Sequence, residues 1–251
     1  MADLSVAFRR STPDDDGDPQ PRNFVVQHKN ALPDPRPYAV ALVVCSVLTL
    51  AVMLHHPTIS ASGTDEVLVE IQSEQLLTKL VHGAMMVLVM IYHQCFSVFS
   101  AWLGAARSGV ALAQLCLHLG LAGYLGAALV SGFVVPGLAS RVSATAEGVR
   151  TVLVALYSAN QALAELGTIG FGAAITLWGL TTLRMQAGAG VPSIIGIIGI
   201  IAGPTIVFGL VANLWSLNVT GMTLVVVILS VWACATAAWL WQQPRGLSQP
   251  C

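Results

Sequence analysis

Six long apolar stretches constrain the fold of this chain more than any other feature of its sequence. A helix needs about 20 mostly apolar residues to cross the hydrocarbon core of a bilayer. Six stretches qualify, at residues 38–55, 77–103, 110–138, 152–183, 192–217 and 220–241. The third and fourth are long for one crossing, so tilt or extension beyond the membrane is expected. The runs are too continuous for a β-barrel, and we predict an all-α polytopic bundle of six transmembrane helices.

The amino-acid composition is not that of a soluble globular protein. Hydrophobic residues make up 55% of the 251 residues and charged residues only 9%. A soluble domain carries about 25% charged residues, so this chain lacks the charge to cover a water-facing surface. The net charge of −1 gives no basis for a nucleic-acid partner. The expected surroundings are the lipid bilayer.

The distribution of lysine and arginine predicts the orientation. With the N-terminus in the cytoplasm, eight basic residues lie inside: Arg9, Arg10, Arg22, Lys29, Arg36, Arg107, Arg184 and Arg245. The other three, Lys79, Arg141 and Arg150, then lie outside. Basic residues are enriched on the cytoplasmic side of membrane proteins. Both termini are therefore expected in the cytoplasm.

Three segments are expected along the chain. Residues 1–36 are rich in Pro and Asp and lack apolar periodicity, which predicts a disordered cytoplasmic tail. Residues 37–242 form the transmembrane domain, and 243–251 a short cytoplasmic tail. The cysteines give no sign of a disulfide framework, because all but the terminal one lie inside predicted spans: Cys45, Cys95, Cys116 and Cys234.

The second span carries polar side chains in an unusual pattern. The segment "KLVHGAMMVLVMIYHQC", residues 79–95, contains two histidines and three methionines. At about 100° per residue, one stripe of the helix contains His82, Met86, Met90 and His93. On the third span, His118 falls within about 5 Å of the depth of His93.

These histidines predict cofactor sites between helices. A b-type haem is held by axial imidazoles, so His93 and His118 are expected to clamp one haem. A second haem would lie between His82 and either His55 or His56. Ala122 and Gly126 follow His118 on nearly the same face and would let a porphyrin edge approach.

Other interpretations of these side chains stay open. Imidazole together with the thioethers of Met86 and Met90 would instead favour copper. Without any cofactor, the histidines would bridge helices by hydrogen bonds, and the methionines would be packing material.

The fourth span contains an acidic residue far from both of its ends. Tyr157, Gln161, Glu165 and Thr168 recur at helical spacing, with Asn160 adjoining. Ionisable groups inside a membrane mark functional sites by default. We expect Glu165 near the bilayer midplane and facing the bundle interior, where it would relay protons or contact a quinone-like ligand. A purely structural carboxyl that ties helices together is the alternative.

Several short motifs resemble those of uncharacterised six-span bacterial integral membrane proteins. In order they are "MLHHP", "LVHGAMM", "YSANQALAELG…AAITLWGL" and "GMTLVVVILSVW". The resemblance covers most of residues 38–241 and implies a six-helix fold in a bacterial inner membrane. It implies no activity, and no functional residue is carried over from it.

Three functions remain compatible with the sequence. The first is a haem- or metal-binding electron-transfer protein. The second is a non-catalytic subunit or accessory protein of a larger membrane complex, and the third is a proton-linked carrier centred on Glu165. No Walker loop, HExxH or GxSxG motif occurs, so whether the protein is an enzyme stays open.

Overall fold

A computed structural model of the chain describes residues 32–58, 63–142, 148–185, 193–214 and 216–244. One compact unit comprises Pro35–Gln243, and everything below concerns it. Of the second unit, Met1–Asp34 with Pro244–Cys251, the structure describes only residues 32–34 and 244, which form no helix. The predicted tails at 1–36 and 243–251 lie almost wholly outside the described residues.

The six predicted spans are confirmed. All regular elements in the described residues are helices, and six of these helices are long and apolar enough to cross a membrane. They are α1 (Arg36–Leu54), α3 (Gln75–Leu103), the continuous run Ser108–Ala139, α6 (Val149–Met185), α7 (Ser193–Val211) and α8 (Val219–Gln242). The run Ser108–Ala139 consists of α4 (Ser108–Leu129), a π-helical turn η1 (Val130–Val134) and α5 (Val135–Ala139). A short helix, α2 (Thr64–Ser73), precedes α3 along the chain.

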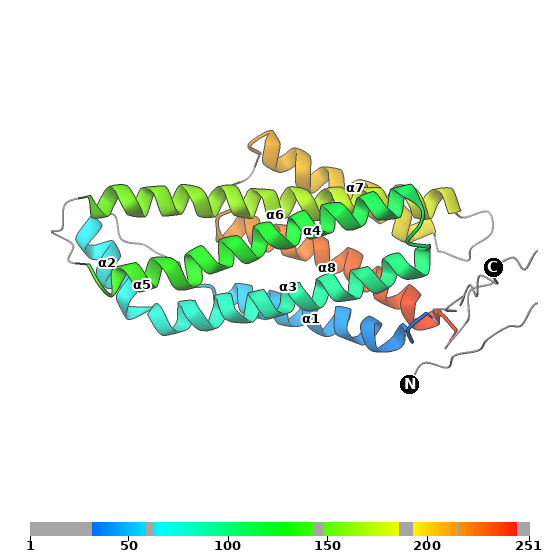
Figure 1. The fold of residues 1–251 in the computed structure, drawn as a ribbon, viewed down its shortest axis with the longest axis horizontal. Helices are drawn as coiled ribbons and strands as arrows, with labels where there is room; N and C mark the ends of the chain where they lie inside the picture. Colours follow the sequence, from blue (N-terminus) through cyan, green and yellow to red (C-terminus); the bar gives the residue numbers. More distant parts are fainter. Residues whose placement is uncertain (1–31, 59–62, 143–147, 186–192, 215, 245–251) are drawn as a thin grey trace, which may run out of the picture. The chain divides into compact units, whose positions relative to one another are not determined.

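The spans differ greatly in length, which explains the two unusually long apolar stretches. With 19 residues, α1 is about 28 Å long and matches the hydrocarbon core, whereas α6, with 37 residues, is about 55 Å long. The additional turns gather at one end with α2 (Figure 1), where Leu68 and Ile71 pack against Ala139 and Val149. We call this the α2 end. The opposite end, where Arg36 lies over Trp241, is the Arg36 end.

Glycines bring α4 and α6 into direct backbone contact. A Cβ on Gly170 would lie 2.5 Å from the amide nitrogen of Gly120. A Cβ on Gly123 would overlap the amide nitrogen of Gly167. Side-chain bulk at these positions would force the helices apart, because close approach in membranes depends on small residues. This contact fixes α4 against the longest helix of the bundle.

Glycines also bring α7 close to α6. Gly199 and Gly203 have the GxxxG spacing and face α6. A Cβ on Gly199 would lie 3.0 Å from the carbonyl oxygen of Ile175, and one on Gly203 would overlap that of Gly172. The neighbour of the glycine motif is therefore α6.

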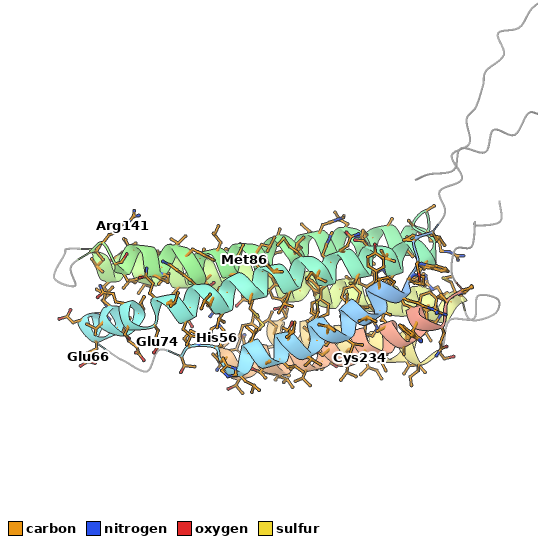
Figure 2. The ribbon with its side chains drawn as sticks, turned by 90° about the horizontal axis from the view of Figure 1, so that it is seen from below. His56, Glu66, Glu74, Met86, Arg141 and Cys234 are labelled. Atoms are coloured by element: carbon orange, nitrogen blue, oxygen red, sulfur yellow. The ribbon has the colours of Figure 1, made fainter. Side chains whose placement is uncertain are left out.

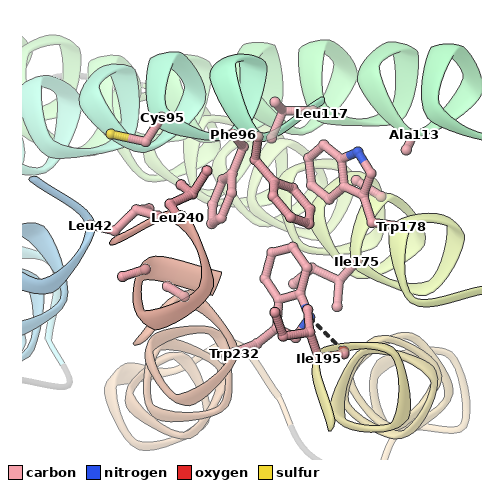
Figure 3. Packing of buried hydrophobic residues seen from close by; sticks show 14 of the residues in the cluster. Leu42, Cys95, Phe96, Ala113, Leu117, Ile175, Trp178, Ile195, Trp232 and Leu240 are labelled. Carbon is pink, nitrogen blue, oxygen red and sulfur yellow. Dashed lines mark hydrogen bonds between the residues drawn. The ribbon is translucent and has the colours of Figure 1, made fainter. Parts of the chain in front are cut away.

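An aromatic cluster fills the core nearer the Arg36 end (Figure 3). Trp178 of α6 and Trp232 of α8 stack with ring centroids 5.6 Å apart. Phe99 of α3 meets both edge-on at 5.8 Å. Trp232 also donates a hydrogen bond from Nε1 to the Ile195 carbonyl at 3.2 Å. The cluster ties α3, α6, α7 and α8 together and leaves the histidines of α3 on another face.

Candidate functional site

Two histidines meet where α1 ends. His56 lies two residues beyond Leu54, and its ring centroid is 5.0 Å from that of His82 on α3, with the planes at 67°. His82 is buried, with 8% of its surface exposed. Of the two candidates for the partner of His82, the structure therefore brings His56 into contact, while His55 is exposed and bonds back to Ala51. Figure 2 shows His56 between the main body of the bundle and the acidic residues of the α2 end.

Hydrogen bonds orient both rings of this pair in the same way. Nδ1 of His82 lies 2.8 Å from the Thr78 carbonyl, and Nδ1 of His56 lies 2.9 Å from the Pro57 carbonyl. Because a carbonyl only accepts, each Nδ1 carries the proton and each Nε2 keeps a lone pair in the neutral ring. Burial lowers the pKa of His56, so its neutral form dominates at pH 7. Metal-ligating histidines are held in this way by backbone carbonyls.

The π-helical turn lies directly behind His82. A Cβ on Gly132 would overlap the Cβ of His82, so only glycine allows this approach. In the same turn, Ser131 donates a 2.7 Å hydrogen bond to Oδ1 of Asn160 on α6. Single π-helical turns inside α-helices occur frequently at functional sites. Asn160, expected beside Glu165, thus serves to anchor the turn that supports His82.

The second predicted pair also meets. The ring centroids of His93 and His118 lie 4.8 Å apart, with the planes at 46°. His93 is about 16 Å along α3 from His82 and about 15 Å from Leu103, so the pair is midway through the bundle. His118 is exposed on the surface of α4, and Nε2 of His93 is buried without a hydrogen-bond partner.

The distances between the ring centroids can be compared with those expected for axial haem ligation and for tetrahedral metal ligation. With metal–nitrogen bonds of about 2.0 Å, the centroid of a ligating imidazole lies about 3.1 Å from the metal. Two imidazoles on opposite sides of a haem iron would then have centroids about 6 Å apart, whereas two ligands at a tetrahedral angle would have centroids about 5 Å apart. The observed 5.0 and 4.8 Å are close to the tetrahedral value and are also ordinary distances for two packed rings.

The space expected at Gly126 for a porphyrin edge is filled. Gly126, expected to leave room for a porphyrin, lies against Leu163, whose side chain a Cβ would approach to 3.1 Å. Among the described residues, no three His, Cys, Asp or Glu side chains form a metal-binding group. Each pair therefore offers two imidazoles, and the predicted haem sites stay a prediction.

A polar network beside His93 was missed by the sequence analysis. Trp178 donates from Nε1 to Ser100, which donates to Oε1 of Gln114, at 3.0 and 2.9 Å. Nε2 of Gln114 donates to Ser97, which donates to the carbonyl of His93, at 2.7 and 2.9 Å. The network fixes α3, α4 and α6 next to the His93–His118 pair. Its signal in the sequence was Gln114, an amide inside an apolar run.

The placement predicted for Glu165 is wrong. Its side chain is exposed on α6 and makes no hydrogen bond or ion pair with any described residue. The first turns of α6 pack with α2 through Val149 and Leu153. Asn160 bonds to Ser131, which adjoins the glycine behind His82, so Asn160 lies at the level of the His56–His82 pair. Glu165 lies about 8 Å further along the axis of α6.

The other residues expected near Glu165 and on the methionine stripe are not brought together. Tyr157 is 64% exposed, Gln161 is half-buried, and Thr168 is fully buried and paired with Tyr124. Met86 is half-buried, and Met90 is 47% exposed along a groove between α1 and α3. Their roles in ligand coupling or metal binding stay predictions.

Comparison with protein-family models, with curated proteins and with solved structures gives no match for this chain. The resemblance to six-span bacterial proteins therefore stays a prediction. What is shown is a polytopic membrane protein with six helices long and apolar enough to cross a bilayer, and with two histidine pairs along α3.

Proposed function

We propose that this protein binds one copper or zinc ion through the His56–His82 pair, on the outer side of a bacterial inner membrane. The observation that carries the proposal is the ring separation of 5.0 Å, which suits two ligands of one tetrahedral ion. Imidazole is a preferred ligand of both metals. A bound copper ion would supply one-electron transfer at the membrane surface.

The surroundings of the pair support this assignment. Both Nε2 lone pairs are free of backbone hydrogen bonds, because Nδ1 makes those bonds. The pair lies where α1 ends, so water can complete the coordination, as it does in open metal sites. The π-helical turn with Gly132 holds His82 from behind. These features also make haem the weaker proposal at this position.

The proposed orientation puts the α2 end outside and both termini in the cytoplasm. Among the described basic residues, Lys79, Arg141 and Arg150 belong to the α2 end, and Arg36, Arg107 and Arg184 belong to the Arg36 end. A reporter enzyme that works only outside the membrane should be active when fused after Ser62 or Ala144. It should be inactive when fused after Ala187 or Ser248. The reverse pattern of activities would refute the orientation.

Metal binding by the His56–His82 pair is best measured in a His118→Ala background, so that the second pair does not contribute. Full-length protein purified without a histidine tag should bind one Zn²⁺ or Cu⁺ per chain in a titration read by elemental analysis. His82→Ala or His56→Ala should weaken binding by about 100-fold or more, because each removes a ligand. Gly132→Ala should weaken it by about 10-fold, because the added Cβ displaces His82.

The matched control is His55→Ala, which removes the exposed neighbouring imidazole and should leave the affinity unchanged. Binding that survives both His56→Ala and His82→Ala would contradict the proposal. A Soret band in the purified protein, lost in those variants, would favour haem instead.

Glu165 favours a second candidate function, that of an accessory subunit. A carboxylate exposed to lipid within the hydrocarbon layer is costly. A helix of a larger membrane complex that covered α6 would remove this cost. A metal-free preparation that contains another membrane subunit in fixed ratio would support this function over metal binding.

A further inference from the structure

Gln94 is a polar side chain exposed midway through the bundle. Along α3 it lies about 14 Å from Leu103, at the Arg36 end, and about 18 Å from His82. Its side chain is exposed and makes no hydrogen bond with a described residue. The amide of Gln114 on α4, by contrast, is bonded at both its oxygen and its nitrogen. An amide that meets only hydrocarbon is costly, so the depth of Gln94 calls for a partner outside the described chain.

Gln94 lines a groove between α1 and α3 with a volume of about 500 Å³. The residues that line it are Pro37, Tyr38 and Ala41 of α1 and Val87, Met90, Ile91, Gln94 and Cys95 of α3. Val87, Met90 and Gln94 are spaced by three and four residues and so share one face of α3. Small-molecule sites have volumes in this range and mostly apolar walls, with a few polar groups that orient the ligand. The groove has this composition, with the Gln94 amide as its polar group.

The depth of Gln94 restricts the chemistry of the ligand. A phospholipid keeps its phosphate and ester groups at the headgroup layer, about 15 Å from the centre of the hydrocarbon core. Its acyl chains would fill an apolar groove but contain no hydrogen-bonding group. The ligand must therefore be soluble in lipid as a whole and carry an uncharged polar head. The NH₂ group of Gln94 carries a partial positive charge, which a carbonyl oxygen complements.

We propose that the groove binds an isoprenoid quinone, whose ring carbonyl accepts a hydrogen bond from the Gln94 amide. A quinone ring is uncharged and has two carbonyl oxygens, and its tail is apolar, so the whole molecule can enter the hydrocarbon core. The inference goes beyond metal binding by the His56–His82 pair and does not depend on it.

The walls of the groove suit the rest of such a ligand. Met90 is exposed along the groove, one turn from Gln94. A methionine thioether is flexible and contacts the edges of planar rings favourably. Val87 continues the same apolar face of α3 beyond Met90 and would lie along the tail. Met90 is thus assigned to the quinone ring.

The test uses full-length protein in detergent and decylubiquinone, a quinone with a short alkyl tail. A ligand that binds the folded state raises the midpoint of thermal unfolding with increasing concentration, and helical circular dichroism measures this shift. Gln94→Leu should weaken binding by about tenfold, because it removes the hydrogen bond and leaves the groove in place. The matched control is Gln242→Leu, which changes an exposed amide at the end of α8 and should leave the binding unchanged.

A second probe, decylbenzene, has the same tail and a ring without carbonyl oxygens. It should bind the wild-type protein about tenfold more weakly than decylubiquinone and should not distinguish wild type from Gln94→Leu. Equal shifts with both probes would show that the groove takes any apolar chain, as a phospholipid would supply, and would overturn the inference. So would a decylubiquinone shift that is unchanged in Gln94→Leu. The absence of any shift in folded wild-type protein would leave Gln94 to a protein partner and rule out the site.

Discussion

Gly123→Ala should destabilise the bundle by about 3 kcal/mol, at the upper end of the usual cost of overpacking. The added Cβ would overlap the amide nitrogen of Gly167, and it would lie 2.6 Å from the Leu163 carbonyl oxygen and 2.8 Å from the Gly167 Cα. All three are backbone atoms, so no side chain can rotate away and α4 must separate from α6. Alanine is the better helix former by about 1 kcal/mol, which the contact outweighs.

Gly137→Ala is the matched control, because the same substitution meets no atom within 4 Å in α5. Its only effect should be the gain in helix propensity, up to about 1 kcal/mol. Thermal unfolding of the two variants in the same detergent measures the difference. Equal midpoints for Gly123→Ala and Gly137→Ala would show that the backbone contact between α4 and α6 contributes little.

The six spans could be predicted because each is recognisable from its own residues. Length and apolar content are local properties, and in a bilayer they determine that a segment forms a helix. The number of helical turns that extend beyond the apolar core of the bundle was less predictable. Residues 149–160 of α6 are almost as apolar as the rest, and only their packing with α2 shows that they extend past α1.

The histidine pairs illustrate what helix phase predicts well. Counting at 100° and 1.5 Å per residue brought His93 and His118 to one depth on adjacent helices, and the rings do meet. The same counting could not show a distance of 4.8 Å rather than about 6 Å. That difference of about 1 Å depends on how α4 packs against α3.

Glu165 shows where the same reasoning fails. Glu165 lies near the middle of its apolar stretch, but the first turns of α6, which include Arg150, pack with α2. Acidic residues in membrane helices usually face the interior of the bundle, but Glu165 does not, because other residues of α6 occupy that face. Around Glu165, the inner faces of α6 are taken by buried Ala164, Gly167 and Thr168.

Phe99→Ala should be the most damaging change in the core, with a loss of about 3 kcal/mol or more. Phe99 is fully buried and meets Trp178, Trp232 and Trp239 edge-on, with ring centroids 5.6–5.8 Å apart. Each such contact contributes about 1 kcal/mol beyond its buried area. Truncation also leaves a cavity between three tryptophans, which rigid rings cannot easily refill.

Phe208→Ala makes the same chemical change on α7, where the ring is 67% exposed. In a bilayer that ring contacts lipid tails, which fill the space after truncation, so the stability should change by less than about 1 kcal/mol. Both substitutions remove the same phenyl ring, and lipid surrounds the unfolded state of both variants. The difference between their losses of stability therefore measures the packing of the ring in the core. Thermal unfolding of both in one detergent gives the test. Similar losses for Phe99→Ala and Phe208→Ala would mean that the aromatic cluster does not hold α3 to α6 and α8.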